Sequence, residues 1–118
     1  MDFQTELKKY QGREWLVVAV DGELDMAVAD QFKEKLTAAL RKSRSRYLML
    51  DFSKVCFIDS SGLGVLLGRY RELALTGGRI MIRHANDQVY RLLVASGLNR
   101  VIEVELPIGY NAAWEGRK

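Results

Sequence analysis

Apolar and polar positions along this chain fall into alternating blocks that predict strands and helices in turn. Residues 15–20 form a nearly continuous apolar run, typical of a strand buried on both faces, and the alternating residues 3–7 predict its antiparallel hairpin partner. Further strands are predicted over residues 47–52, 79–84 and 101–104.

The segments between the strands carry apolar residues at helical spacing. The first helix is expected to begin at Asp25 and the second at Asp59 and Ser60, because these side chains can cap a first helical turn. The glycines at residues 77–78 and at Gly97 are expected to end the second and third helices. The predicted buried stripes are Val28, Phe32, Leu36 and Leu40 in the first helix, Leu63, Leu66, Leu67, Tyr70 and Leu73 in the second, and Val89, Leu92 and Leu93 in the third.

Strands that alternate with helices predict right-handed βαβ units and a mostly parallel sheet. We therefore expect an α/β fold: a single open sheet of about five strands with an antiparallel edge strand, βαβ crossovers and about four helices, in one domain over residues 1–118. The fourth helix is a short segment at residues 110–114, which Leu106 and Trp114 are expected to pack against the domain.

The loops that leave the carboxyl ends of parallel strands gather at one edge of such a sheet. Here these loops are predicted at residues 21–25, 54–61 and 84–87, with a turn at residues 51–54. The side chains expected at this edge are Asp25, Asp59, Ser60, Ser61 and His84. This edge is therefore the expected functional side of the molecule.

Composition narrows the class of protein. The 118 residues, 48% apolar and 28% charged, are typical of one soluble globular domain and exclude a disordered chain. A net charge of +3 does not by itself indicate nucleic-acid binding, and the basic cluster at residues 41–46 is interpreted as a solvated helix end. The longest apolar runs are too short for a membrane span, so a cytoplasmic protein is expected.

A single cysteine and a single histidine restrict the redox and metal chemistry. Cys56 has no partner for an internal disulfide, and Cys56 with His84 supplies too few ligands for a metal site, so no metal or other cofactor is expected. Because its neighbours are apolar, Cys56 is predicted to be a buried small hydrophobe. Core positions are also predicted for Trp15, Phe32, Phe52 and Phe57.

Residues 59–62, Asp-Ser-Ser-Gly, are here called the serine turn. A phosphate on Ser60 or Ser61 would lie at a helix amino end, where backbone N–H groups lack partners and the helix dipole favours negative charge. Gly62 and Gly64 would let another protein approach the backbone closely. On local physics alone, simple helix capping and tight packing are favoured over these functional interpretations.

A serine hydrolase is a further alternative, with Ser60, His84 and an aspartate as nucleophile, base and orienting acid. The turn is not a G-x-S-x-G elbow, and no loop for an oxyanion hole is recognisable. Residues 62–68 are glycine-rich but lack the lysine and spacing of a phosphate-binding P-loop. Catalysis is therefore disfavoured.

Three stretches of the chain resemble bacterial anti-sigma factor antagonists, which belong to the STAS domain family. Residues 57–70, FIDSSGLGVLLGRY, are similar to the phosphorylation-site region of these proteins. Residues 22–25, GELD, resemble the first loop at the functional edge, and residues 92–98 resemble the end of the third helix. The resemblance spans roughly residues 15–104.

The resemblance implies a protein switch and no enzyme activity. Family members of this kind bind an anti-sigma factor that is also a serine kinase, and so free a sigma factor. The kinase then phosphorylates the serine of the turn, the antagonist is released, and a serine phosphatase resets it. By its place after the aspartate, Ser60 is the implied acceptor and Ser61 the less favoured neighbour. Asp25 and Asp59 are implied to flank the acceptor and to present it to the kinase.

The expected partner-binding residues are Asp25, Asp59, Ser61, Gly62, Leu63 and Gly64. Direct contact with nucleic acid or a membrane is not expected, and a monomer is the simpler expectation. The alternative is a STAS-like docking subunit of a transporter or signalling assembly, in which the serine turn is a fixed contact surface. The tail after Pro107 is shorter than the last helix of many family members, which leaves a partner contact there in doubt.

Overall fold

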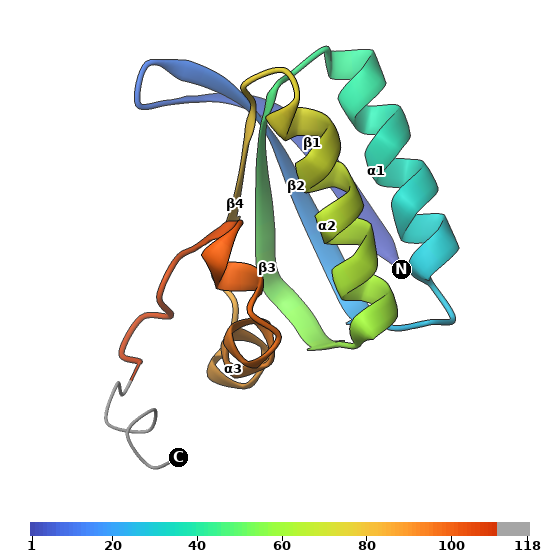
Figure 1. Ribbon diagram of the computed structural model, residues 1–118, viewed down its shortest axis with the longest axis vertical. Helices are drawn as coiled ribbons and strands as arrows, with labels where there is room; N and C mark the ends of the chain where they lie inside the picture. Colours follow the sequence, from blue (N-terminus) through green and yellow to red (C-terminus); the bar gives the residue numbers. More distant parts are fainter. Residues whose placement is uncertain (111–118) are drawn as a thin grey trace.

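The computed structural model describes residues 1–110 and shows a five-stranded sheet with helices packed on it (Figure 1). The elements in chain order are β1 (Asp2–Tyr10), β2 (Arg13–Leu24), α1 (Ala29–Ser43), β3 (Tyr47–Ile58), α2 (Ser60–Ala74), β4 (Arg79–Arg83), α3 (Asp87–Ala95), the 3-10 helix η1 (Leu98–Arg100) and β5 (Glu103–Val104). The strand order is β1-β2-β3-β4-β5, with β1 antiparallel to β2 and the other pairings parallel. The predicted open α/β sheet with an antiparallel edge strand is confirmed.

The described residues contain three α-helices and one 3-10 helix, close to the four helices expected. The short helix predicted at residues 110–114, and with it Trp114, lies outside the described residues beyond Tyr110. Leu106 was expected to pack against the domain, and this prediction is wrong, because its side chain is 60% exposed.

Strands β2 and β3 are both longer than the sequence pattern predicts. The turn expected at residues 51–54 is wrong, because β3 runs through it to Ile58, and β2 likewise continues past Gly22 to Leu24. Two register shifts in the pairing, one of them next to Gly22 with its φ of +111°, let the strands stay hydrogen-bonded while they bend. The polar residues of the supposed turn, Ser53 and Lys54, simply face solvent.

Helix α1 begins three residues later than predicted. Asp25 is not its cap: the N-cap position is Val28, which makes no side-chain capping bond. The Asp25 carboxylate instead accepts a hydrogen bond from the Ala27 amide at 3.0 Å, and its carbonyl accepts one from the Val28 amide at 3.2 Å, which closes a turn before the helix. The predicted stripe is confirmed, since Phe32 and Leu36 are buried and the two other members pack on the core.

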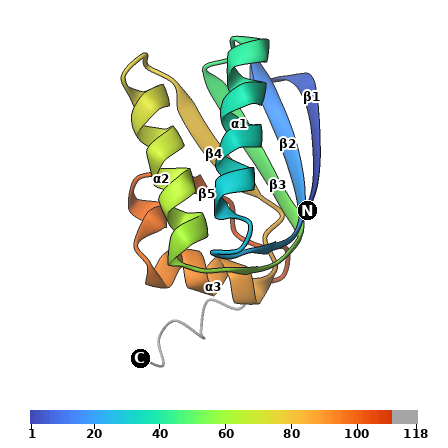
Figure 2. The same ribbon diagram turned by 90° about the vertical axis from the view of Figure 1, so that its right-hand side faces the viewer.

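Helices α1 and α2 cover one face of the sheet, and α3 crosses its lower end (Figure 2). The main core lies between these helices and the sheet, where Phe32, Leu50 and Leu66 are fully buried. A smaller cluster lies on the opposite face of the sheet and is built by strands alone, from Trp15, Met49 and Met81. Trp15 is therefore a core residue as predicted, but on the face that α1 and α2 leave open.

Two predicted core residues are at the surface. Cys56 is exposed and Phe57 is 38% exposed, so both predictions are wrong. They lie on the last part of β3, beyond Asp51, the last residue that pairs with β4. In this part of β3 only Phe52, Val55 and Ile58 face the core. Strand β4 does not pair with β3 beyond Asp51, so it leaves Cys56 and Phe57 uncovered.

Candidate functional site

The serine turn joins β3 to α2 and is held by an aspartate cap. Asp59 is the N-cap of α2, and its Oδ1 accepts hydrogen bonds from the Ser61 amide at 2.8 Å and the Gly62 amide at 3.2 Å. The Asp59 carbonyl accepts the first helical bond from the Leu63 amide at 3.0 Å. The prediction that Asp59 caps the helix is confirmed. Ser60 is the first residue of the helix, and its side chain does not cap it.

Asp59 also ties the serine turn to the loop between β2 and α1. Its second carboxylate oxygen, Oδ2, accepts a hydrogen bond from the Met26 amide at 3.1 Å, and its own amide donates to the Leu24 carbonyl at 3.2 Å. The turn that follows Asp25 therefore lies directly against the serine turn, as the parallel topology predicts. One carboxylate fixes the relative position of both loops.

The predicted site residues differ in how far they face solvent. Ser60 and Gly64 are exposed, and Asp25, Asp59, Ser61 and Leu63 are partly buried. Gly62 is buried. Of the two serines of the turn, Ser60 is therefore the more exposed.

The two glycines of the first turn of α2 do different things. A Cβ on Gly62 would overlap the backbone carbonyl of Leu24 and crowd the side chain of Ile58, so only glycine lets α2 start this close to β2. A Cβ on Gly64 would meet nothing within 4 Å. Gly62 is therefore explained by close packing of α2 against β2. Gly64 has no packing role and leaves the backbone of α2 open to solvent.

His84 does not join the serine turn. Strand β4 ends at Arg83, which pairs with Asp51, and Asp51 precedes Asp59 by eight residues of chain. Eight strand residues span about 26 Å at about 3.3 Å each. His84 instead lines a hollow on the other face of the sheet, with Trp15 and Met49. The hydrolase constellation of Ser60 and His84 is therefore not formed.

Sequence reasoning missed Met26 and Arg69. Met26 is 78% exposed, and its amide bonds to Asp59. It lies in a loop, where the spacing of apolar residues does not indicate which side chains are important. Met26, Ser61, Gly64 and Arg69 line a groove of about 390 Å³ between α1 and α2. The groove leads away from the serine turn along α2.

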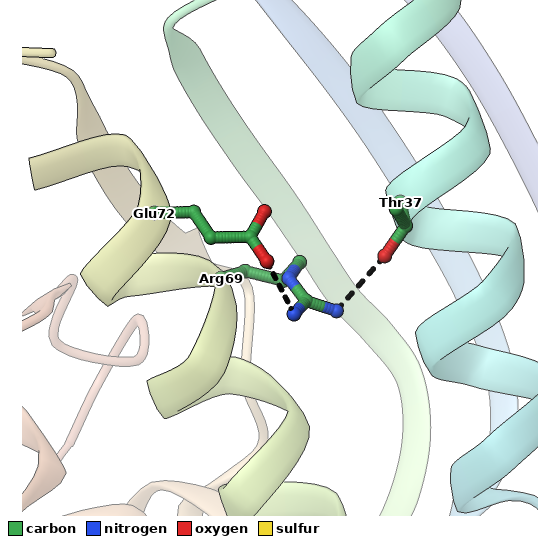
Figure 3. Close-up of polar contacts among 3 residues, drawn as sticks. All are labelled: Thr37, Arg69 and Glu72. Carbon is green, nitrogen blue, oxygen red and sulfur yellow. Dashed lines mark hydrogen bonds and ion pairs between the residues drawn. The ribbon is translucent and has the colours of Figure 1, made fainter. Parts of the chain in front are cut away.

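Arg69 is the one buried charged residue among residues 1–110, with 6% of its surface exposed. Its Nη1 donates to Thr37 Oγ1 at 2.9 Å and its Nη2 to Glu72 Oε1 at 2.8 Å, so the guanidinium links α2 to α1 (Figure 3). Its Nε has no hydrogen-bond partner. Because a helical arginine usually faces solvent, only the tertiary structure reveals this link.

The described residues offer no group of three or more histidine, cysteine or acidic side chains that could hold a metal ion. None of the helices within residues 1–110 combines the length and the apolar character needed to cross a bilayer.

Comparison with known proteins assigns the fold. Residues 4–110 match the STAS domain. The chain belongs to the STAS domain family. Among STAS proteins it is similar to the anti-sigma F factor antagonist of Paenibacillus polymyxa, with 34% identity over 88% of this chain and 87% of the relative. It is also similar to the anti-sigma-B factor antagonist of Listeria monocytogenes, with 29% identity over 89% of this chain and 90% of the relative.

A solved structure shares this fold. The Bacillus cell fate determinant SpoIIAA in its phosphorylated form matches with a TM-score of 0.62 and 30% identity, over 89% of this chain and 92% of that chain. The resemblance of residues 57–70, 22–25 and 92–98 to this family is thereby confirmed at the level of the whole domain.

Proposed function

We propose that this STAS protein is an anti-sigma factor antagonist whose binding to an anti-sigma factor kinase is switched off by phosphorylation of Ser60. Two relatives named as anti-sigma factor antagonists cover most of the chain, and a related solved structure is described as a phosphorylated form. The observation that carries the assignment is the exposed Ser60 side chain at the first position of α2, beside a turn held rigidly by Asp59.

The arrangement of Asp59 supports a release mechanism based on charge. The amides of Ser61 and Gly62, which a phosphate at this helix end would otherwise use, already donate to Asp59. A phosphate on Ser60 would therefore face outward, toward a bound partner, with the Asp59 carboxylate next to it. Repulsion and the cost of desolvating about two added negative charges would weaken a docked complex by about 3–4 kcal/mol, or about two to three powers of ten in affinity.

The surface that meets the partner is proposed to include both loops at this edge of the sheet. The partner-binding set predicted from the sequence is Asp25, Asp59, Ser61, Gly62, Leu63 and Gly64. Gly64 offers open backbone, and the exposed Met26 adds an apolar contact beside Asp59. Gly62 contributes indirectly, because it sets how closely α2 begins against β2.

The proposal is tested with the anti-sigma factor kinase recovered as a binding partner, incubated with ATP and this protein. Intact-mass measurement is expected to show one added phosphate on the wild type and on Ser61→Ala, and none on Ser60→Ala. In calorimetry, Ser60→Ala should bind the kinase as the wild type does, and Ser60→Asp should bind poorly while keeping the native circular dichroism spectrum.

Three outcomes would count against the proposal or its mechanism. If Ser60→Ala gains phosphate as fast as the wild type and Ser61→Ala does not, then Ser61 is the acceptor. If the wild type binds a partner but never gains phosphate, the protein is a docking subunit with a fixed serine turn, which is the alternative function. A large backbone change in the phosphorylated form would contradict the local charge mechanism.

A further inference from the structure

The face of the sheet opposite α1 and α2 carries a hollow of about 250 Å³ that the proposed switch does not use. Its apolar lining is Tyr10, Trp15, Val17 and Met49, which belong to the strand-built cluster on that face. The Trp15 indole is fixed beneath the hollow, because its Nε1 donates to the Tyr10 carbonyl at 3.2 Å and its ring lies tilted against Tyr47, with 5.4 Å between the ring centres. Trp15 is almost fully buried, so the apolar surface open to a ligand is that of Tyr10 and Val17, which are partly exposed.

The curvature of the sheet brings its two sides together over this hollow. Tyr10 is on β1 and Arg83 is on β4, three strands away, which is about 14 Å across a flat sheet. Yet the Arg83 guanidinium carbon lies 5.5 Å from the centre of the Tyr10 ring. The twist of the sheet has thus made this face concave, and long side chains from the outer strands form the sides of the hollow.

Charges of both signs line the hollow, and their internal contacts leave part of each charged group without a partner. Arg83 Nε donates to Glu105 at 2.9 Å, but its Nη1 contacts only the Met49 sulfur, at 4.0 Å. Asp51 pairs in register with Arg83, and among residues 1–110 it forms no ion pair; its Oδ1 accepts only the Ser53 amide at 2.9 Å. Lys8 is held only by a loose, exposed contact with Glu6 at 3.8 Å.

We propose that this hollow binds a free α-amino acid with an apolar or aromatic side chain. The carboxylate of the ligand would face Arg83 and Lys8, its ammonium group would face Asp51, and its side chain would lie on Tyr10 and Val17, the partly exposed apolar residues of the lining. An α-amino acid carries its two charged groups on one carbon atom, which suits Asp51 and Arg83 on adjacent strands about 4.8 Å apart.

The chemistry of the hollow favours a zwitterion over a simple ion. A purely anionic ligand would meet Asp51 and Glu6, and a purely cationic one would meet Arg83 and Lys8, so each would place like charges together. The volume lies just below the range of pockets that hold drug-sized ligands, which favours a small molecule. The hollow and the serine turn lie on different parts of the protein, so this inference stands independently of the proposed function.

Titration calorimetry tests the proposal with L-leucine and L-phenylalanine as probes. Leucine amide, which carries only the cation, and N-acetyl-leucine, which carries only the anion, are the matched ligands. The free amino acids are expected to bind saturably and at least about tenfold more tightly than either single-charge analogue. In a Trp114→Phe variant, Trp15 is the remaining tryptophan, and its fluorescence should change with the same midpoint.

The decisive variant is Asp51→Asn, which keeps an oxygen for the Ser53 amide and removes the charge. It should lower leucine affinity at least about tenfold while leaving N-acetyl-leucine binding unchanged or stronger. Asp30→Asn, an exposed carboxylate on α1, is the control and should bind leucine as the wild type does. No saturable signal up to about 10 mM amino acid, equal binding of all three leucine compounds, or preferential binding of inorganic phosphate would each overturn the proposal.

Discussion

The double role of Asp59 leads to a quantitative expectation about stability. Its Oδ1 caps α2 through the amides of Ser61 and Gly62, and its Oδ2 holds the Met26 amide. Loss of a capping side chain costs about 1 kcal/mol, and loss of one further hydrogen bond costs about 1 kcal/mol. Asp59→Ala should therefore lower the free energy of unfolding by about 2 kcal/mol, or the Tm by about 8 °C at about 4 °C per kcal/mol.

Two further variants separate the two contributions. Asp59→Asn keeps one oxygen to cap the helix, but its amide nitrogen cannot accept from Met26, so the loss should be about 1 kcal/mol. Asn86→Ala is the comparison variant, because Asn86 caps α3 through the Val89 amide at 2.8 Å, away from the serine turn. Its Nδ2 also donates to the Val55 carbonyl, but at 3.4 Å this bond is long and should add little to the loss. Asn86→Ala should also cost about 1 kcal/mol.

Urea unfolding followed by far-ultraviolet circular dichroism measures all three variants. The expected order of loss is Asp59→Ala greatest, with Asp59→Asn and Asn86→Ala close to half of it. If Asp59→Ala costs no more than Asn86→Ala, the Met26 contact contributes nothing and the reasoning that Asp59 joins the two loops is refuted. An Asp59→Asn loss equal to that of Asp59→Ala would refute the capping part instead.

Three other expectations follow from packing and exposure. Gly62→Ala should lower the free energy of unfolding in urea by about 2–3 kcal/mol, because the added methyl group meets the Leu24 carbonyl. Gly64→Ala should be neutral or stabilising by up to about 1 kcal/mol. Similar losses in both variants would contradict the close approach of α2 to β2. Arg69→Met should change the free energy of unfolding by less than about 1 kcal/mol, since an apolar side chain of similar length replaces a buried guanidinium. Arg69→Ala should lower it by about 3 kcal/mol. A large loss in the methionine variant would show that the hydrogen bonds to Thr37 and Glu72 are essential. Cys56 should react completely with a thiol reagent in the native protein, and labelling that required denaturant would contradict its exposed position.

The sequence by itself determined the fold class and the position of the serine turn. Alternation of apolar and polar residues depends only on neighbours within a few positions, so it specified the order of strands and helices and the buried stripe of α1. In α2 it missed the buried Val65 and Arg69, while the predicted Leu63, Leu67 and Tyr70 are only partly buried. Capping is equally local, which is why Asp59 could be recognised as a helix start. The same local signals misplaced Asp25, which closes a turn before the helix.

Only the tertiary structure decided what depends on pairing between distant segments. The extension of β3 through residues 51–54 comes from its ladder with β2, which no local pattern encodes. That extension carries the serine turn away from His84 and leaves Cys56 exposed. The approach of Tyr10 to Arg83 across the sheet results from the curvature of the whole sheet, because twist accumulates over several strands. Local interactions thus determine where α2 begins, and pairing between distant strands determines which side chains lie together there.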